Sequence, residues 1–210
     1  MNNEQMNNSL LDTMKSPYLE GITIDLGEII LDQLTGADGA IKDIPIIGSF
    51  VKTIKLGLTV KDVIFIKKLG EFLWNLKDIP TEKRIELIRM LEKDSKNKNN
   101  AGEKILLLLE RADDFEKPKF MANAFKAYLN LKISYSQLQK INFALDHLYI
   151  GDIKDFELFW QNPKHHMDES THQNLALCGL VYSSQVLSGG TRVKINEFGE
   201  LFAKNVLECR

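Results

Sequence analysis

Cysteine is scarce in this chain, with only Cys178 and Cys209 among 210 residues. Two isolated thiols form neither a disulfide framework nor a paired Cys-x-x-Cys motif for metal or redox chemistry. A large excess of one charge is also missing, because 27 basic and 29 acidic residues leave a net charge of −2. A protein devoted to non-specific nucleic-acid binding is normally strongly basic. The sequence therefore predicts a cytoplasmic protein with reduced cysteines, outside that class.

Hydrophobic runs long enough to cross a membrane are also missing. A spanning helix needs about 18 or more consecutive apolar residues, but charged side chains repeatedly interrupt the most apolar region, residues 44–76. The first eight residues are polar, with neither the basic start nor the apolar stretch of a secretory signal. At 44% hydrophobic and 27% charged residues, the composition is that of a folded globular chain.

Sequence motifs that carry catalytic chemistry are not found. The chain has no Walker-type phosphate loop and no Gly-x-Ser-x-Gly elbow. The stretch from Gly36 to Gly39 is too short to indicate a nucleotide site. We therefore expect no catalytic residue and no cofactor, and we interpret the chain as a non-enzymatic protein that acts by binding.

The apolar residues predict a mainly α fold, beginning with a helical bundle over residues 1–133. Their spacing follows the helical period of 3.6 residues from Leu10 onward. A turn is expected at Gly36–Gly39, and a possible internal loop at residues 94–100. The run from Ile105 to Leu109 is apolar on every side, which predicts a central core helix.

Residues 134–210 predict a separate winged-helix-like module with one β-hairpin. Ser134-x-x-Gln137 is a capping box that opens its first helix. Gly151-Asp152 is expected to stop that helix and to cap the second, and a third helix near 168–178 ends at Gly179. Two strands, 180–187 and 191–195, follow around a Ser-Gly-Gly turn, and Asn196 caps a closing helix.

Two short sequence segments of this module resemble those of known protein families. Residues 175–181 (Leu-Ala-Leu-Cys-Gly-Leu-Val) and 195–202 (Ile-Asn-Glu-Phe-Gly-Glu-Leu-Phe) resemble the endings of many prokaryotic winged-helix-like domains. They are also similar to the C-terminal part of uncharacterised bacterial helical proteins of abortive-infection (phage-defence) type. The resemblance implies a bacterial or phage origin and a role in phage defence or counter-defence. It transfers no catalytic residue.

A winged helix raises the alternative of a DNA-binding transcription regulator, whose third helix enters the major groove. Here that helix begins with Asp168 and Glu169 and carries no Lys or Arg, which opposes contact with phosphates. Base edges could be read by Gln173 and Asn174. The DNA backbone could be reached by two basic residues of the wing, Arg192 and Lys194. We expect a protein partner rather than DNA.

Three residues of the same region have a spacing that could bind a divalent metal. His165, Glu169 and His172 lie at i, i+4 and i+7, on one face of a continuous helix. A metal site needs further ligands and second-shell support, and neither is visible. We therefore predict no metal and interpret these side chains as a solvated helix start. Asp146 and His147 are adjacent, so on a helix they point in different directions and predict no acid–base pair.

Residues 44–77 predict two amphipathic helices with a break near Gly57, because the polar arcs of 46–56 and 58–77 are out of phase. The simpler interpretation is two core helices whose lysines face water. The alternative is an element that leaves the core to associate with an anionic membrane surface or a partner. The basic residues that it would use are Lys52, Lys55, Lys61, Lys67 and Lys68.

Overall fold

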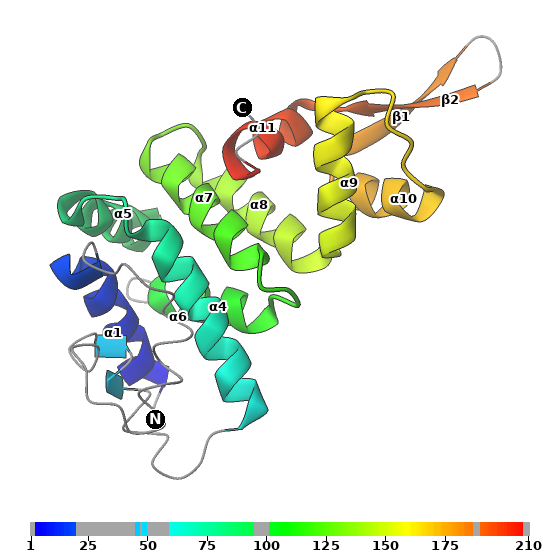
Figure 1. Ribbon diagram of the computed structural model, residues 1–210. Coiled ribbons are helices and arrows are strands. Elements are labelled where there is room, and N and C mark those ends of the chain that lie inside the picture. The colour runs from blue at the N-terminus through cyan, green and yellow to red at the C-terminus, as the bar shows by residue number, and fades with distance from the viewer. Residues whose placement is uncertain are drawn as a thin grey trace. The chain divides into compact units, whose positions relative to one another are not determined.

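The structure is a computed structural model, and it describes residues 3–19, 45–46, 48–49, 59–94, 101–186 and 190–207. The predicted fold class is confirmed at the coarse level, since these described residues are mainly helical with a small antiparallel sheet (Figure 1). The chain forms two compact units, and the boundary between them lies between Ala122 and Asn123. The division falls inside a helix, whereas the boundary expected from the sequence, after residue 133, follows that helix. No helix in the described ranges has the length and apolar character to cross a bilayer.

The N-terminal unit is built from helices that pack around α1 and α6. Its elements are α1 (Asn3–Lys15), the short 3-10 helix η1 (Pro17–Leu19), α4 (Val60–Leu76), α5 (Thr81–Asp94), α6 (Ala101–Arg111) and the start of α7 (Lys117–Leu129). Helix α1 contacts both α5 and α6, and α4 contacts α6. The core between them contains Leu10, Met14, Phe72, Leu87 and Leu109.

Helix α4 begins at Val60, later than the predicted residue 58. Thr59 forms a capping box with Asp62: the Thr59 hydroxyl accepts the Asp62 N–H, and the Asp62 carboxylate accepts the Thr59 N–H. The Thr59 hydroxyl also donates to the Asp62 carboxylate at 2.6 Å, and this bond, together with the one from the Thr59 N–H, lowers the pKa of Asp62. One face of the helix is buried, through Ile66, Leu69, Phe72, Leu73 and Leu76. This face of α4 is core, as the simpler interpretation of the segment expects.

Helix α6 contacts α1, α4 and α5, as a core helix does, but its apolar run is not buried on every side. Ile105 and Leu109 are buried, but the side chain of Leu107 is 43% exposed. The neighbours of α6, namely α1, α4 and α5, leave that side of the helix in solvent. Five consecutive apolar residues therefore do not require that every side of a helix is buried.

Several sequence predictions fall outside the described residues. They are the turn at Gly36–Gly39, most of the helix expected over 46–56 with Lys52 and Lys55, the break near Gly57, the loop after Asp94 and the centre of the hairpin turn.

After the remainder of α7, the C-terminal unit has three helices, a hairpin and a closing helix, in the predicted order. The elements are α8 (Tyr135–His147), α9 (Ile150–Gln161), α10 (Glu169–Leu177), β1 (Val181–Val186), β2 (Gly190–Ile195) and α11 (Glu197–Val206). The capping box of Ser134 and Gln137 is confirmed, as is the Asn196 cap. Gly179 has φ +75°, a conformation that favours glycine, and it turns the chain from α10 into β1.

The expectation that Gly151-Asp152 separates α8 from α9 is wrong. Helix α8 ends at His147, and the extended residues Leu148 and Tyr149 make the break. Gly151 and Asp152 lie within the first turn of α9, where Asp152 is buried. A Gly-Asp pair is a frequent helix boundary, but here the carboxylate is used inside the unit.

Candidate functional site

The surface formed by α10 and the β-hairpin is the candidate functional site, and a buried carboxylate on α9 holds it in place. Asp152 is 6% exposed. Its Oδ1 accepts a hydrogen bond from Thr171 Oγ1 at 3.0 Å, and its Oδ2 accepts one from Asn174 Nδ2 at 3.0 Å. Asp152 also lies in the first turn of α9, where the helix dipole favours a negative charge. These two bonds fix the rotation of α10 about its axis.

A second polar contact joins α10 to the hairpin. His172 Nε2 and Ser183 Oγ are hydrogen-bonded at 3.0 Å. Behind this contact lies an apolar core in which the rings of Phe156 and Phe202 meet edge to face, with centroids 6.0 Å apart. Leu175 and Leu180 are fully buried on either side of the Gly179 turn. The packing therefore presents one defined face of α10 to solvent.

The solvent face of α10 is acidic at its start and apolar at its end. Asp168 caps the helix, and the hydrogen bond from the Thr171 N–H lowers the pKa of its carboxyl group. Gln173 is exposed and donates to Glu169 Oε1 at 2.9 Å. Leu177, in the last turn, is 83% exposed. The helix carries no Lys or Arg.

The hairpin adds a basic and aromatic face to this site. In its register Tyr182 lies opposite Lys194, and Ser184 lies opposite Arg192. Because side chains alternate along a strand, these four share one side of the sheet. Tyr182, Arg192 and Lys194 are all exposed there. Ser183, on the other side, faces His172 of α10.

The residues predicted to contact DNA differ in their exposure to solvent. Gln173, Arg192 and Lys194 are exposed, as a contact residue must be. Asn174 is half-buried and its Nδ2 donates inward to Asp152, so that amide nitrogen is already engaged within the unit. The physical reason is that the buried Asp152 carboxylate needs donors, and Asn174 supplies one.

His165, Glu169 and His172 are not brought together as metal ligands. Helix α10 begins at Glu169, so His165 lies before the helix rather than one turn earlier on it. His165 Nε2 contacts Asp155 Oδ1 at 3.2 Å, and His172 bonds Ser183. In the described ranges, no group of three His, Cys, Asp or Glu residues could hold a metal ion.

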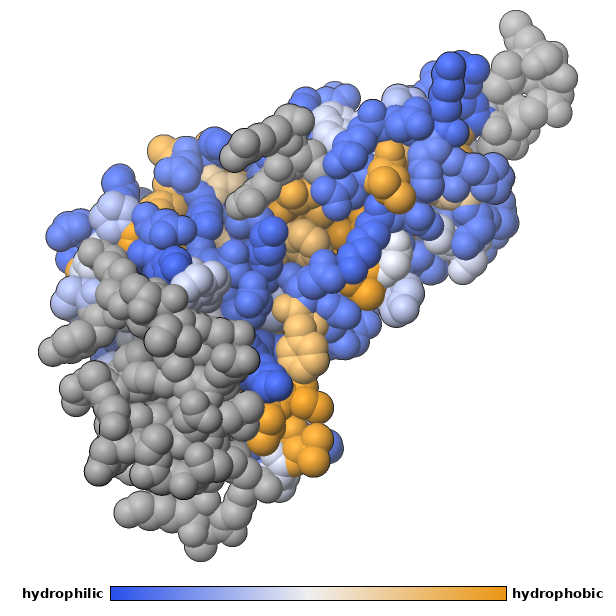
Figure 2. All heavy atoms as spheres, viewed as in Figure 1, coloured by the Kyte–Doolittle hydropathy of each residue, from blue (hydrophilic) through white to orange (hydrophobic). Residues whose placement is uncertain are grey.

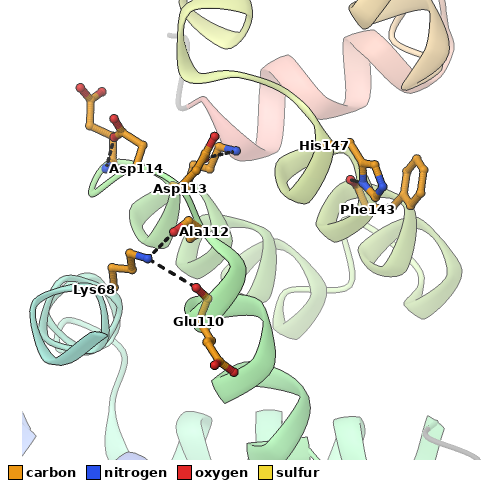
Figure 3. A network of polar contacts seen from close by, with 9 residues as sticks. Lys68, Glu110, Ala112, Asp113, Asp114, Phe143 and His147 are labelled. Carbon is orange, nitrogen blue, oxygen red and sulfur yellow. Dashed lines mark hydrogen bonds and ion pairs between the residues drawn. The ribbon is translucent and has the colours of Figure 1, made fainter. Parts of the chain in front are cut away.

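His147 forms a surface contact with a ring of its own helix. Its Nδ1 lies 2.8 Å from the Phe143 carbonyl oxygen, and the two rings stack with centroids 4.0 Å apart (Figure 3). Since a carbonyl oxygen only accepts, Nδ1 donates and carries the proton.

The lysines of α4 have two different environments. Lys61 and Lys67 are exposed, as expected of residues that face water. Lys68 is 8% exposed, and its Nζ donates to the carbonyl oxygens of Ala112 and, at 3.5 Å, Glu110 (Figure 3). Placing Lys68 on a solvated or membrane-facing surface is therefore wrong. Its ammonium group is instead hydrogen-bonded at the end of α6, where helix carbonyls lack intrahelical partners.

The surroundings of Lys68 contain several charges. Burial lowers the pKa of Lys68 because it disfavours the ammonium, while the carboxylates of Asp113 and Glu110 oppose that effect and nearby Lys117 adds to it. Lys117, whose side chain is fully buried, forms an ion pair with Asp113 at 2.5 Å. The arrangement closes the corner between α6 and α7 and is structural.

Sequence reasoning missed Asp152, Thr171, Ser183, Tyr182 and Leu177 as parts of the site. The only available signal was the spacing of Thr171 and Asn174, which puts both on one helix face. Nothing in the sequence shows that Asp152 is their acceptor.

Comparison of the chain with protein-family models, with curated proteins and with solved structures finds no match. The resemblance of residues 175–202 to winged-helix-like and abortive-infection proteins therefore stays a prediction.

Proposed function

We propose that this protein acts by binding another protein, and that the outer surface of α10 and the hairpin makes the contact. In this proposal the C-terminal unit is a winged-helix-like module. The order of α8, α9, α10, the β1–β2 hairpin and α11 supports that assignment. A role in phage defence or counter-defence follows from the resemblance alone, and a plaque assay with and without the gene tests it.

The exposed Leu177 carries the proposal. An 83% exposed leucine at the end of an otherwise well-packed helix gains by burial against a partner, at about 25 cal/mol per Å² of apolar surface. Tyr182, 45% exposed on β1, adds an aromatic residue of the kind enriched in protein interfaces. The acids at the start of α10 oppose DNA phosphates. Its Asn174 is turned inward to Asp152.

The direct test is affinity purification of the full chain from its source organism, followed by a comparison of two leucine variants. Leu177→Asp should lose the captured protein, because it puts a charge into the proposed interface. Leu158→Asp is the matched control, since Leu158 is 48% exposed on α9. Equal retention by both variants contradicts the proposal. Capture of a defined DNA sequence that Arg192→Ala abolishes favours the regulator alternative instead.

A second candidate function is association with an anionic membrane surface through the first turns of α4. Val60 is 76% exposed and Ile64 is 37% exposed, and apolar surface gathers over this part of α4 in Figure 2. Lys61 and Lys67 are exposed on the same helix. Apolar side chains beside lysines favour an anionic bilayer.

Vesicle co-sedimentation separates this second candidate from the first. Val60→Ser combined with Ile64→Ser should abolish binding to vesicles that contain phosphatidylserine and leave the fold intact. Binding of the wild type that does not weaken with salt would exclude an electrostatic membrane contact, because surface attraction is screened beyond about 10 Å at 0.1 M.

A further inference from the structure

The free edge of β1 carries backbone groups that the hairpin does not use. The Asn196 N–H donates to the Leu180 carbonyl at 3.3 Å, which puts residues 180 and 196 at the position of a hydrogen-bonded pair at the open end of the ladder, although the Leu180 N–H donates to Leu175. Such pairs alternate with non-bonded pairs in an antiparallel ladder. Tyr182 and Ser184 are therefore bonded to β2, whereas the N–H and C=O of Ser183 point away from it.

Nothing in the described part of the chain occupies that edge at Ser183. No backbone bond in the described ranges reaches its outward N–H, and its hydroxyl is engaged by His172 on the α10 side. A two-stranded ribbon is marginally stable by itself, and a third strand adds backbone hydrogen bonds to it. Position 183 is thus a free donor and acceptor at the centre of a six-residue strand.

The two edges of the ribbon differ in charge. Strand β1 reads Val-Tyr-Ser-Ser-Gln-Val, with no charged residue, proline or glycine. Strand β2 carries Arg192 and Lys194. Natural proteins place charged side chains, lysine above all, or proline on exposed edge strands, and these residues keep the edge from pairing with another strand. The edge of β2 has this protection, and the edge of β1 does not.

We propose that β1 pairs antiparallel with β1 of a second copy of this chain, about a twofold axis. The product is a four-stranded sheet in which the two β2 strands lie outermost. An uncharged strand is self-complementary in this arrangement, since each copy offers the same groups to the other. Pairing through β2 instead, centred on Val193, would set Arg192 of one copy opposite Lys194 of the other and is disfavoured by like-charge repulsion. The inference does not depend on a partner at Leu177.

The test is analytical ultracentrifugation of the full chain over a range of concentrations. We expect a monomer–dimer equilibrium in the wild type. Ser183→Pro removes an outward N–H and leaves the β1–β2 hydrogen bonds in place, so it should raise the dimer dissociation constant at least about 30-fold. It also removes the hydroxyl contact with His172, whereas Ser183→Ala removes that contact alone and should leave dimerisation unchanged. Val193→Pro is the matched control. Val193 lies opposite Ser183 and points its N–H outward on β2, so dimerisation should be unchanged.

A second measurement needs no substitution. In hydrogen exchange on the wild type, protection of the Ser183 amide should rise with protein concentration, while the Ser184 amide stays protected throughout. A wild type that is monomeric up to about 1 mM, the weak end of specific association, overturns the proposal. A dimer that Ser183→Pro does not weaken places the contact elsewhere. Binding of an extended peptide by a monomeric wild type assigns the edge to a different partner.

Discussion

The two units of this protein satisfy the ends of their helices in different ways. In the C-terminal unit, Ser134, Asp168 and Asn196 each accept the N–H three residues ahead, at the start of α8, α10 and α11. In the N-terminal unit, side chains from distant elements do most of this work. Each unit has an exception. Thr59 is a local cap in the N-terminal unit. In the C-terminal unit Asn123 is a remote cap, which donates to the Val206 carbonyl at 2.8 Å.

Helix α6 shows the N-terminal pattern most clearly. Asn7 of α1 accepts the Glu103 N–H at 3.0 Å, in the first turn of α6. Lys68 of α4 donates to the carbonyls of Glu110 and Ala112 at its other end. Both partners are far away in sequence, so α6 depends on tertiary packing for both of its termini. The comparison teaches that one chain can hold one unit with local signals and another with long-range polar contacts.

The largest effect is expected at Arg84, which is fully buried. Its guanidinium donates to the carbonyls of Met14 and Ser16, both at 2.7 Å, and to that of Ile79. Arg84→Met leaves these acceptors without a donor and should cost about 3–5 kcal/mol of unfolding free energy, by analogy with breaking a buried charged contact. Urea denaturation measures the loss.

The control for Arg84 is on the same helix. Arg89 is exposed on α5, and Arg89→Met should change stability by less than about 0.5 kcal/mol. Equal effects of the two substitutions would mean that the contacts of Arg84 do not hold the N-terminal unit together.

The next largest effect is expected at the hydrogen bond between Asp152 of α9 and Asn174 of α10 in the C-terminal unit. Asp152→Ala and Asn174→Ala should each destabilise, and a double-mutant cycle should give a coupling of about 1–2 kcal/mol because the two side chains share a buried hydrogen bond. Thermal unfolding of the four proteins measures it. Additive effects would show that Asp152 does not position α10 through Asn174.

These contacts show how far the sequence predicts the fold. The capping boxes are short-range patterns, so Ser134 and Asn196 could be identified from neighbouring residues alone. Thr59 and Asp62 form the same pattern. Because Leu58 fits the apolar period of the helix, however, the helix was predicted to begin at residue 58 instead of after Thr59. Charged side chains normally face solvent, and the lysines of residues 44–77 were assigned there on that ground. That rule fails for Lys68, Arg84 and Asp152, since burial depends on which distant carbonyl or donor the fold brings near.

The candidate site follows the same division. Exposed Gln173, Arg192 and Lys194 were predictable from helix and strand positions. Asn174 was not, because its inward orientation is set by a carboxylate on another helix. The exposure of Leu177 was also hidden, since a leucine near the end of an amphipathic helix normally belongs to the core.

A smaller effect is expected at a local cap. Ser134→Ala removes the acceptor of the Gln137 N–H and should cost about 1 kcal/mol, the usual value of an N-cap. Ser136→Ala, at an exposed position of the same helix, should be close to neutral. Chemical denaturation of both variants makes the comparison. A loss at Ser136 as large as that at Ser134 would remove the cap as the explanation.

The smallest effect is a pH dependence at Lys68. Its pKa in the folded protein lies below the ordinary value of 10.5, because burial disfavours the ammonium. Between the two values the unfolded chain binds more protons, so stability rises as the pH increases toward 10.5. The free energy of unfolding of the wild type relative to Lys68→Met should therefore increase over this range. Parallel pH curves for the two proteins would contradict this assignment.

The contrast between remote and local capping is tested most directly by hydrogen exchange in Asn7→Ala, with Asp12→Ala as the exposed control on α1. The Glu103 amide loses its acceptor, so it should exchange at least about tenfold faster, the factor that corresponds to 1.4 kcal/mol. The Gln137 amide, held by Ser134 within its own helix, should keep its rate. An unchanged rate at Glu103, or an equal acceleration at Gln137, would contradict the claim that α6 is capped from α1.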